Sequence, residues 1–548
     1  MSFADELRGI VRGEVETDDA TLTRASRDAS LFVVKPEAVV APQDAEDICA
    51  LVKFASAKKT ADPQAHVSLT ARSAGTDMSG GPLTDSIVLD MTPHFNRIIE
   101  VGKDSAIVEP GVYFRDFDKA TQAHGLELPS YTASREINTV GGMVANDSGG
   151  EKNLKYGKTS RYLESIDVVL ADGEVHTLKR LEGDALVAKL KELSFEGDLY
   201  RRVSKLLTSH GPVIEHARPA VSKNSSGYAL WDIGDGVRSL DLARLMCGAQ
   251  GTLGIITKID FRLVQPEKYS AMTIIMLKDL NDLGAIIPDV LTYKPDSFES
   301  YDDNTFKLAA KYFPEFALQM KMGLLKLGLA FLPEVWMLLS GGIPKLVLMV
   351  EFRADRQEEA TARAQKLADD IHTMRPHVRV RVAKDEQAAR KYWVIRRESF
   401  NLLRKKVRNM RTAPFIDDFV VPPASLPEFL PKLQAILKNY DLFETIAGHV
   451  GDGNFHIIPL MDPKRKDDMH IIDELSHRVY DLVLSYHGSI TGEHNDGMIR
   501  TPYVEKMFGP DMTELFRDIK HMFDPLNIFN PGKKVGTTWE ESMKHLDL

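Results

Sequence analysis

Cysteine is almost absent from this chain of 548 residues, which contains only Cys49 and Cys247. Two thiols cannot build a disulfide framework. They also cannot supply the four cysteine ligands of a zinc or iron–sulfur site held by this chain alone. A protein without disulfides is typical of a reducing compartment, so we expect a cytoplasmic location.

A surplus of positive charge is also missing. The chain has 69 Lys and Arg against 79 Asp and Glu, which gives a formal net charge of −10, and it contains no long basic run. Binding to nucleic acid needs clustered Lys and Arg that neutralise phosphates. We therefore expect no nucleic-acid partner.

An apolar leader is missing as well. The first residues, MSFADELRGIVRGEVETDD, are acidic and predict neither a signal peptide nor a transit peptide. Residues 320–342 are long enough to span a bilayer, but Lys321, Lys326, Pro333 and Glu334 interrupt them. We expect a buried pair of helices that is broken at Pro333. The alternative is a peripheral contact of 320–342 with the inner face of a membrane.

The length exceeds what one hydrophobic core supports, so two or three domains are expected. In the first half, short apolar runs alternate with helical patterns at 43–57 and 183–210. Residues 165–178 predict a strand, an Asp-Gly turn and a second strand. The apolar run at 251–264 predicts a long strand, and we place a domain boundary after it, near residue 265.

The second half repeats the alternation. Apolar strands are predicted at 271–278 and 345–352, and helices at 279–294, 356–374 and 385–408. Strands and helices in this order predict a sheet that is covered by helices, which is an α+β fold.

Three segments are rich in glycine and other small residues, at 71–81, 139–150 and 248–257. Glycine lets successive backbone N–H groups converge on one point, and such nests bind anions such as pyrophosphate. One such loop is usually a plain turn, but three in one domain favour a cofactor that carries phosphate. The spacing excludes a G-x-G-x-x-G dinucleotide motif, and Lys152 stands where a P-loop requires glycine.

The order of these loops resembles the FAD-binding domain of flavoproteins of the vanillyl-alcohol-oxidase type. In that family the first two loops clasp the FAD pyrophosphate. The resemblance implies a first clasp made by Arg72, Ser73, Ala74, Gly75, Thr76 and Asp77, and a second made by Thr139, Gly142, Asn146, Ser148, Gly149 and Gly150, with Tyr156 and Gly157 nearby. Gly251, Thr252 and Ile256 would contact the nucleotide. Thr76 stands where some relatives attach FAD through a histidine, so non-covalent FAD is implied.

We therefore expect an α+β protein of three parts. A FAD-binding domain of two α/β subdomains would occupy residues 1–265. A cap domain, with an antiparallel sheet covered by helices, would occupy 266–505 and bind substrate and metal. A C-terminal helical segment, 506–548, would pack back on the first domain.

Two histidines, His449 and His456, flank a tight Gly-Asp-Gly-Asn turn. If Val450 opposes Phe455 in a hairpin, then the two histidines oppose each other, with Cβ atoms about 4.5–5.5 Å apart. Two imidazoles at that distance can share one divalent metal, and the best source of a third ligand is the segment 488–500, where Glu493 and His494 are adjacent. Zinc is the first expectation for such a site, with Fe(II) and Mn(II) as alternatives. The competing interpretation is a polar cross-strand pair without a metal.

The segments GHVGDGNFH (448–456) and GEH (492–494) resemble the metal motifs of FAD-linked D-2-hydroxy-acid dehydrogenases, and DDFVVPPASLP and FDPLNIFNPGKKVG are similar to two further family segments. The resemblance implies that His449, His456 and Glu493 bind the metal, that His494 is the catalytic base, and that Arg396 holds the substrate carboxylate. Arg397 is a rival for that last role. Asn530 and Lys533 would lie in the segment that returns to the flavin.

Three positions depart from the family pattern. The loop that contains the predicted base His494 is EHNDG instead of Glu-His-Gly-x-Gly. Asp496 in this loop could raise the pKa of His494. Ile416 and Ile458 stand where relatives acting on D-2-hydroxyglutarate have polar residues. A short or apolar D-2-hydroxy acid such as D-lactate is therefore the expected substrate.

Other functions stay open at this point. The same flavin scaffold serves transferases that resemble alkyl-glycerone-phosphate synthase, and the chain could be a flavin subunit of a larger complex. Because two cysteines cannot hold a cluster, electrons would pass to an external acceptor such as a quinone, an electron-transferring flavoprotein or an iron–sulfur subunit. A homodimer is among the expected assemblies.

Overall fold

The structure is a computed structural model that describes residues 2–305, 307, 342–406, 411–440, 442, 446–461 and 468–547, with only the backbone for 398–406. Nearly all of 320–342 lies outside this part, including Lys321, Lys326, Pro333 and Glu334, so neither the predicted helix pair nor the membrane contact can be followed there. Among the described residues, no helix is long and apolar enough to cross a membrane.

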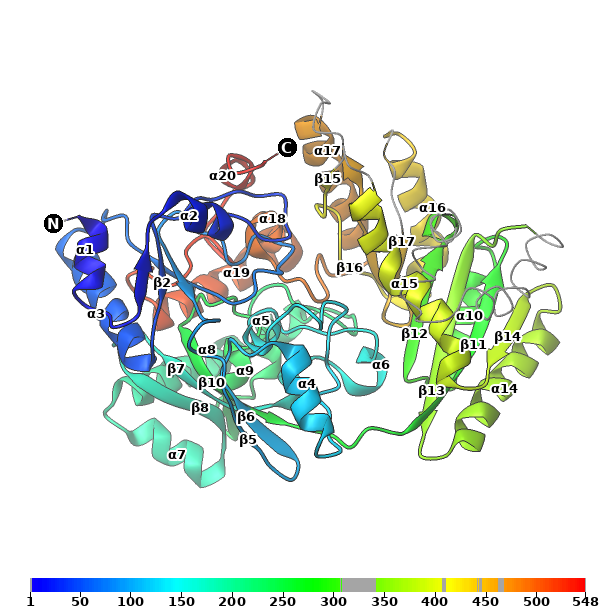
Figure 1. The fold of residues 1–548 in the computed structure, drawn as a ribbon, viewed down its shortest axis with the longest axis horizontal. Coiled ribbons are helices and arrows are strands. Elements are labelled where there is room, and N and C mark those ends of the chain that lie inside the picture. The colour runs from blue at the N-terminus through cyan, green and yellow to red at the C-terminus, as the bar shows by residue number, and fades with distance from the viewer. Residues whose placement is uncertain are drawn as a thin grey trace.

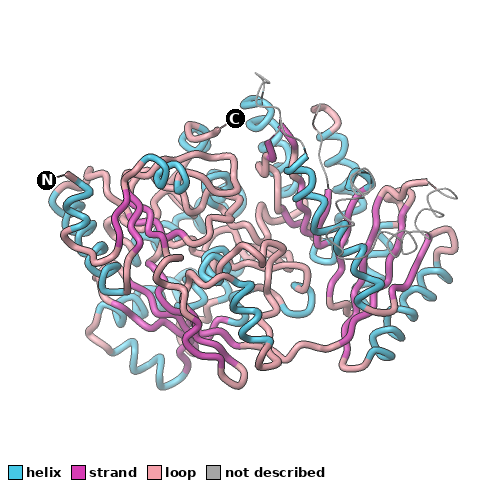
Figure 2. Tube along the Cα trace, viewed as in Figure 1, coloured by secondary structure: helices cyan, strands magenta, loops and turns pink. Residues whose placement is uncertain are grey.

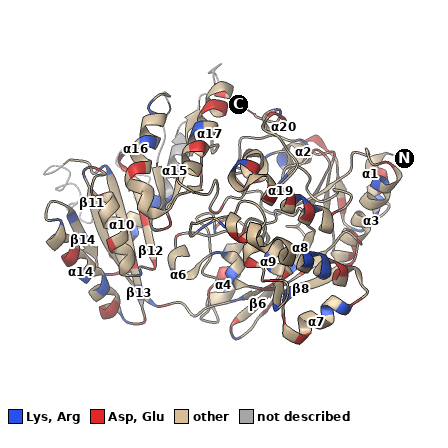
Figure 3. Ribbon diagram, turned by 180° about the vertical axis from the view of Figure 1, so that it is seen from behind, with Lys and Arg blue, Asp and Glu red and all other residues tan. Residues whose placement is uncertain are grey.

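The chain forms two lobes and crosses between them near residue 265 and again between α17 (Asp468–Ser485) and α19 (Val504–Phe523) (Figure 1). Loops run through much of the region where the lobes meet (Figure 2). Acidic and basic residues are interspersed along the helices of both lobes (Figure 3).

The N-terminal lobe contains two sheets. The first has the order β1-β2-β4-β3, with β2, β4 and β3 parallel. The second is antiparallel, with the order β5-β6-β10-β7-β8-β9. The strands of the first sheet are β1 (Glu14–Glu16), β2 (Ala38–Ala41), β3 (Leu69–Arg72) and β4 (Ile87–Asp90), and those of the second are β5 (Ile98–Val101), β6 (Ser105–Val108), β7 (Leu163–Val169), β8 (Val175–Glu182), β9 (Ser239–Asp241) and β10 (Ile255–Arg262).

Helices pack on both sheets because the helices present apolar faces to them. In α3 (Ala45–Ala61), the residues Ile48, Leu51, Val52 and Ala55 are fully buried against the first sheet. The 23-residue helix α8 (Phe195–Ala217) likewise buries Leu199, Val203, Leu206 and Leu207. The other helices of this lobe are α1 (Phe3–Arg8), α2 (Asp19–Ala25), α4 (Phe114–Gln122), α5 (Val140–Asn146), α6 (Asn153–Tyr156), α7 (Gly183–Lys191) and α9 (Leu242–Met246).

The second lobe is built on one antiparallel sheet of seven strands, with the order β14-β11-β13-β12-β17-β18-β16. Alternate residues of its central strands point to opposite faces, so Ile274 packs against α15 and Ile275 packs on the side of α10, α14, α16 and α17. The strands are β11 (Tyr269–Leu277), β12 (Ser297–Asp302), β13 (Leu346–Ala354), β14 (Arg379–Ala383), β16 (Phe419–Val420), β17 (Ile446–His449) and β18 (Asn454–Ile457). The helices are α10 (Leu283–Thr292), α14 (Gln357–Met374), α15 (Glu386–Lys406), α16 (Leu426–Leu437) and α17 (Asp468–Ser485); β15 (Arg411–Thr412) pairs with β19 (Leu460–Met461).

The chain ends by returning to the N-terminal lobe. Helix α19 (Val504–Phe523) contacts α8, and its residues Leu515, Phe516 and Ile519 belong to the core of that lobe. Phe529 then forms a parallel bridge with Leu69 at the edge of the first sheet. Figure 1 shows this red segment beside the blue and green elements. The C-terminal residues therefore lie beside the glycine loops.

Most predicted elements are present. The helical structure predicted over 183–210 is present as two helices, α7 and α8, because the Ser194 hydroxyl accepts a hydrogen bond from Gly197 N and starts a new helix. The glycine-rich segment 139–150 is not all loop. Thr139 accepts from Gly142 N and caps the short helix α5.

Polar pairs connect the two lobes. Arg397 of α15 pairs with Glu151, which follows the second glycine loop, and the guanidinium lies 4.5 Å from the centroid of the Trp393 ring. Asn153 Nδ2 donates to Asp452 Oδ1 at 2.9 Å. The residues that follow the second glycine loop are thus joined to the cap through a half-buried charged pair and a buried amide group.

The Glu151–Arg397 pair predicts a pH-dependent stability. Burial opposes ionisation of Glu151, but Arg397 outweighs it and lowers the pKa of this carboxyl to about 2. A carboxyl whose folded pKa is depressed stabilises the fold above its ordinary pKa, and this contribution, on the order of 3 kcal/mol, is lost as the pH falls from about 4.5 towards 2. The midpoint of thermal unfolding should therefore drop in Glu151→Gln near neutral pH, and the drop should shrink with acidification.

The control for this prediction is Glu174→Gln. Glu174 forms an exposed pair with Lys53, with 62% of its side chain accessible, and such pairs contribute little. If Glu151→Gln and Glu174→Gln have the same midpoint of thermal unfolding at every pH, the Glu151–Arg397 pair does not stabilise the fold.

Candidate active site

The three glycine loops meet at the end of the first sheet. Asn146 Nδ2 donates to Asp77 Oδ1 at 2.8 Å, which ties the second loop to the first. Gln250 Nε2 donates to Asn146 Oδ1 at 3.2 Å, which adds the third loop. Asn530 Nδ2 donates to the carbonyl oxygens of Gly81 and Gln250 at 2.9 and 2.7 Å. The structure thus brings together the loops and the C-terminal residue that the sequence resemblance assigned to one cofactor.

The first loop, residues 72–77, folds back on its own arginine. Arg72 closes β3, and its guanidinium donates to the carbonyl oxygens of Ala25 and Arg27 at 3.2 and 2.6 Å. Gly75 has φ of +64°, and a Cβ atom there would lie 2.1 Å from Arg72 Nη2. Only glycine fits this position without a rearrangement. The guanidinium itself serves the loop structure.

The second loop reaches the cap. Ser148 O accepts from Thr159 N, and a Cβ atom on Gly150 would lie 2.2 Å from Tyr131 O. A Cβ atom on Gly149 would lie 3.6 Å from Glu493 Oε1. One of the predicted metal ligands therefore lies directly against a predicted flavin loop, although the two are more than three hundred residues apart in the sequence.

The remaining predicted cofactor residues differ in their surroundings. Gly251 has φ of +69° and open space around it. The Thr252 hydroxyl is fully buried and bonded to Ala249 O and to the Tyr228 hydroxyl, at 2.7 Å in each case. Ile256 lies half-buried in β10. Of these three, Gly251 has the position of a residue that a nucleotide could approach.

The last predicted cofactor residues are Tyr156, Gly157 and Lys533. Tyr156 and Gly157 end α6, a helix that contacts β12 of the cap. Lys533 is buried and donates to Leu83 O at 2.6 Å, and burial lowers the pKa of its amine to about 8. Lys533 therefore fastens the C-terminal segment next to the first loop.

The histidine hairpin is present, but its register differs from the prediction. His449 pairs with Asn454, and His456 pairs with Ala447. The turn is Val450–Asp452 followed by Gly453 at φ of +71°, so the strands are offset by two residues from the expected pairing. An offset of two preserves the face. The imidazoles still lie on one side as diagonal neighbours, with ring centroids 5.3 Å apart and planes at 88°.

The side chains of His449, His456 and Glu493 converge. Each offers a ligand atom within 4.8 Å of the others, so these three could hold one cation. His449 Nε2 lies 3.3 Å from Glu493 Oε1. The other ring nitrogen of each histidine already has a carboxylate partner, since His449 Nδ1 lies 2.6 Å from Glu299 and His456 Nδ1 lies 3.1 Å from Asp417. Two imidazoles and one carboxylate, with carboxylates behind the rings, fit an open divalent-metal site.

Asp418 shapes the loop that carries Glu493 and His494. Its Oδ2 accepts from the backbone N–H groups of Gly492, Glu493 and His494 at 3.0, 2.9 and 2.7 Å, and from the Thr491 hydroxyl at 2.6 Å. Asp418 itself adopts φ of +68°, which is unusual for a residue with a side chain. One carboxylate thus fixes the loop backbone.

Lys223 is a functional candidate that the sequence alone did not reveal. Its side chain is completely buried, and its ammonium pairs with Glu493 and lies 3.5 Å from Asp452 Oδ2. A buried charge of this kind must be paired to be tolerated. The lysine comes from a loop of the N-terminal lobe, so it connects that lobe to a predicted metal ligand of the cap.

Charges set the protonation of the site. Burial disfavours the charged imidazoles, but Glu299 outweighs it and raises the pKa of His449 to about 9. Burial is likewise outweighed at His494, where Asp418 and Asp417 raise the pKa to about 9. Asp496, which the sequence suggested as the cause, instead pairs with Lys534 at 2.9 Å.

The two adjacent arginines have separate roles. Arg396 lies on α15 with 13% of its side chain accessible, and its Nη2 is 3.3 Å from Glu299 Oε2. Glu299 therefore contacts both Arg396 and the metal-ligand candidate His449. Arg397 is engaged with Glu151 and Trp393. The geometry places Arg396, and not Arg397, next to the converging histidines.

Comparison with protein families defines the class. Residues 36–179 match the model described as "FAD binding domain", and residues 267–534 match "FAD linked oxidases, C-terminal domain". The chain therefore carries a FAD-binding domain followed by the C-terminal domain of FAD-linked oxidases. The 4-ethylphenol oxidase from Gulosibacter chungangensis has the same fold, with a TM-score of 0.69 and 16% identity over 98% of this chain and 97% of that one. The predicted fold of the vanillyl-alcohol-oxidase type is confirmed.

Two relatives are similar in sequence to nearly all of this chain. A D-2-hydroxyglutarate dehydrogenase of Pseudomonas putida is 28% identical over 97% of this chain and 51% of its own length. A D-lactate dehydrogenase of Archaeoglobus fulgidus is 28% identical over 98% of this chain and 99% of its own length. The chain therefore spans about half the length of the first relative and nearly all of the second.

Proposed function

We propose that this chain is a FAD- and divalent-metal-dependent dehydrogenase that oxidises a D-2-hydroxy acid to the 2-oxo acid. The observation that carries the proposal is the position of His449, His456 and Glu493, which converge against the second glycine loop with His494 beside them. The names of the two relatives support the class of substrate and its handedness.

The cofactor residues are proposed from the same arrangement. Non-covalent FAD would be held by the loops at 72–77, 139–150 and 248–256, and it would accept a hydride from C2 of the substrate. Zinc is proposed for the two histidines and Glu493, with Fe(II) and Mn(II) as alternatives, because all three cations accept this donor set.

Arg396 and His494 carry the proposed roles towards the substrate. The Arg396 guanidinium matches a carboxylate in a planar, bidentate way and would orient the acid. His494 would accept the hydroxyl proton at Nε2, because Asp417 engages its Nδ1 at 2.8 Å. A divalent cation held nearby would polarise the substrate hydroxyl and, as a neighbouring positive charge, would lower the pKa of His494.

A short or apolar side chain is proposed for the substrate. Ile416 and Ile458 are buried apolar residues that adjoin Asp417 and follow His456 by two positions. Neither can pair with a second carboxylate. The electrons would pass to an external acceptor, either a quinone, an electron-transferring flavoprotein or an iron–sulfur subunit, because Cys49 and Cys247 cannot hold a cluster.

A substrate panel tests the proposal. Anaerobic mixing of the metal-loaded flavoprotein with D-lactate, glycolate, D-2-hydroxyglutarate and L-lactate should bleach the flavin absorbance fastest with D-lactate. Replacement of Ile416 by lysine supplies a cation next to Asp417 and should shift the preference towards D-2-hydroxyglutarate. If no acid in the panel reduces the flavin, the proposed reaction is wrong.

A further inference from the structure

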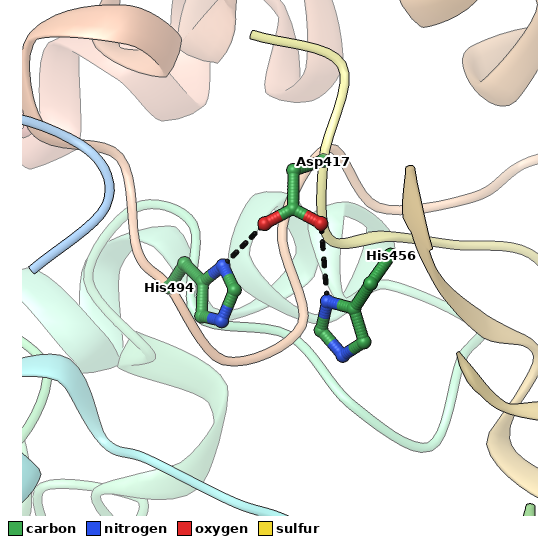
Figure 4. Close-up of side chains that lie close together, drawn as sticks. All are labelled: Asp417, His456 and His494. Atoms are coloured by element: carbon green, nitrogen blue, oxygen red, sulfur yellow. Dashed lines mark hydrogen bonds and ion pairs between the residues drawn. The ribbon is translucent and has the colours of Figure 1, made fainter. Parts of the chain in front are cut away.

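One buried carboxylate contacts two imidazoles of the candidate site. Asp417 is completely buried, with His456 Nδ1 3.1 Å from its Oδ1 and His494 Nδ1 2.8 Å from its Oδ2. The two rings are stacked, with centroids 5.1 Å apart and planes at 29°. Figure 4 shows the carboxylate between the rings, with both free ring nitrogens on the far side from it.

The chemistry of a carboxylate decides where the protons lie. An ionised carboxylate can only accept hydrogen bonds, so each Nδ1 that faces Asp417 must carry a hydrogen. In a neutral imidazole the other nitrogen then has the lone pair. His456 and His494 are thereby both held with an Nε2 that can bind a cation or accept a proton.

The backbone around Asp417 is fixed, which makes this arrangement rigid. Its carbonyl oxygen accepts from Nη2 of the fully buried Arg500 at 2.7 Å. The next residue, Asp418, holds the loop of His494 through three backbone N–H groups. The two neighbouring aspartates therefore hold the ring and the backbone of His494 respectively.

We propose that Asp417 is a positioning residue that fixes the Nδ1–H tautomer of both His456 and His494, so that one carboxylate prepares a metal-ligand nitrogen and a proton-accepting nitrogen together. The functional meaning of the two nitrogens rests on the proposed dehydrogenase. The tautomers themselves follow from the two short N···O contacts with the carboxylate, a hydrogen bond at His456 and an ion pair at His494.

Replacement of Asp417 by asparagine tests whether one carboxylate sets the tautomers of both rings. An asparagine at position 417 has one carbonyl oxygen and one amide NH₂, so it can accept from only one ring and must donate to the other. The second ring is forced into the Nε2–H form and loses its free lone pair. Glutamine at position 299 faces only one ring, His449, and its carbonyl can keep that tautomer. Glu299→Gln is therefore the matched control.

The experiment uses the full chain with FAD and zinc, labelled with ¹⁵N-histidine. Nitrogen chemical shifts should show both His456 and His494 with hydrogen on Nδ1 in the wild type, and one of them with hydrogen on Nε2 in Asp417→Asn. Zinc affinity, measured by competition with a chelating dye, or the rate of flavin reduction should fall about 10- to 100-fold in Asp417→Asn, as for other partners of metal-ligating histidines. In Glu299→Gln the tautomers of His456 and His494 should stay those of the wild type. Because Glu299 also pairs with Arg396, the tautomers and not the rate of flavin reduction provide the comparison.

Asp417→Glu keeps a carboxylate and should retain the wild-type tautomers, which makes the test independent of whether Asp417→Asn folds. A wild-type spectrum with no hydrogen on Nδ1 of His456 or His494, or unchanged tautomers in Asp417→Asn, would overturn the proposal. Correct tautomers in a protein that reduces its flavin with no hydroxy acid would leave the inference standing and reject the dehydrogenase.

Discussion

Replacement of His494 by alanine should lower the rate of flavin reduction by roughly 10²- to 10⁴-fold, the usual contribution of a positioned general base. The imidazole has 22% of its side chain accessible and is fixed through Asp417 and the backbone of its loop. Because His494 lies beside the proposed metal ligands and is not one of the three, FAD and zinc should stay bound. Single-turnover mixing with D-lactate measures the rate, and metal analysis measures the zinc.

His470→Ala is the control for this variant. His470 belongs to α17, with 78% of its side chain accessible, and it interacts with Glu474 on the same helix. Its removal should leave the rate unchanged. A His494→Ala protein that reduces its flavin as fast as this control would show that another group takes the hydroxyl proton.

Replacement of His456 by alanine should remove the metal and the activity together. The remaining donors, His449 and Glu493, would still face each other at 3.3 Å, but two ligands hold zinc far more weakly than three. Loss of a metal that supplies several kcal/mol of charge stabilisation should slow flavin reduction by about 10³-fold. Elemental analysis after dialysis should find zinc in the wild type and little in the variant.

The FAD content distinguishes this effect from unfolding. His456 lies on β18 of the cap, whereas the glycine loops belong to the N-terminal lobe. The flavin absorbance of His456→Ala should therefore match that of the wild type. A variant that keeps its zinc and its rate would place the cation elsewhere, for example between Asp417, His456 and His494, whose ligand atoms also lie within 4.8 Å of one another.

Local patterns predicted much of the architecture. The apolar period of α3, the Asp-Gly turn between β7 and β8 and the buried strands β11 and β13 could be recognised because each depends on neighbours in the sequence. The register of the histidine hairpin could not be predicted. The turn uses Gly453 in a left-handed conformation after a short helical turn, and this shifts the pairing by two residues.

Most residues that contact the predicted metal ligands and the catalytic base could not be predicted from the sequence. Lys223 and Glu299 reach the candidate site from two separate parts of the chain, and nothing near them in sequence indicates that they meet it. Asp417 and Asp418 had a signal, because two adjacent aspartates before an apolar strand are unusual and must both be satisfied when buried. Only the folded chain shows that Asp417 contacts the rings of His456 and His494, whereas Asp418 binds the backbone of the His494 loop.

Stopped-flow mixing of zinc-loaded and chelator-stripped protein with D- and L-lactate, without oxygen, tests most directly whether a cation beside the flavin drives the reaction. Rapid loss of flavin absorbance with D-lactate in the loaded protein alone, restored when zinc is returned to the stripped protein, is the result that the arrangement of His449, His456 and Glu493 predicts. Equal rates in loaded and stripped protein would contradict it.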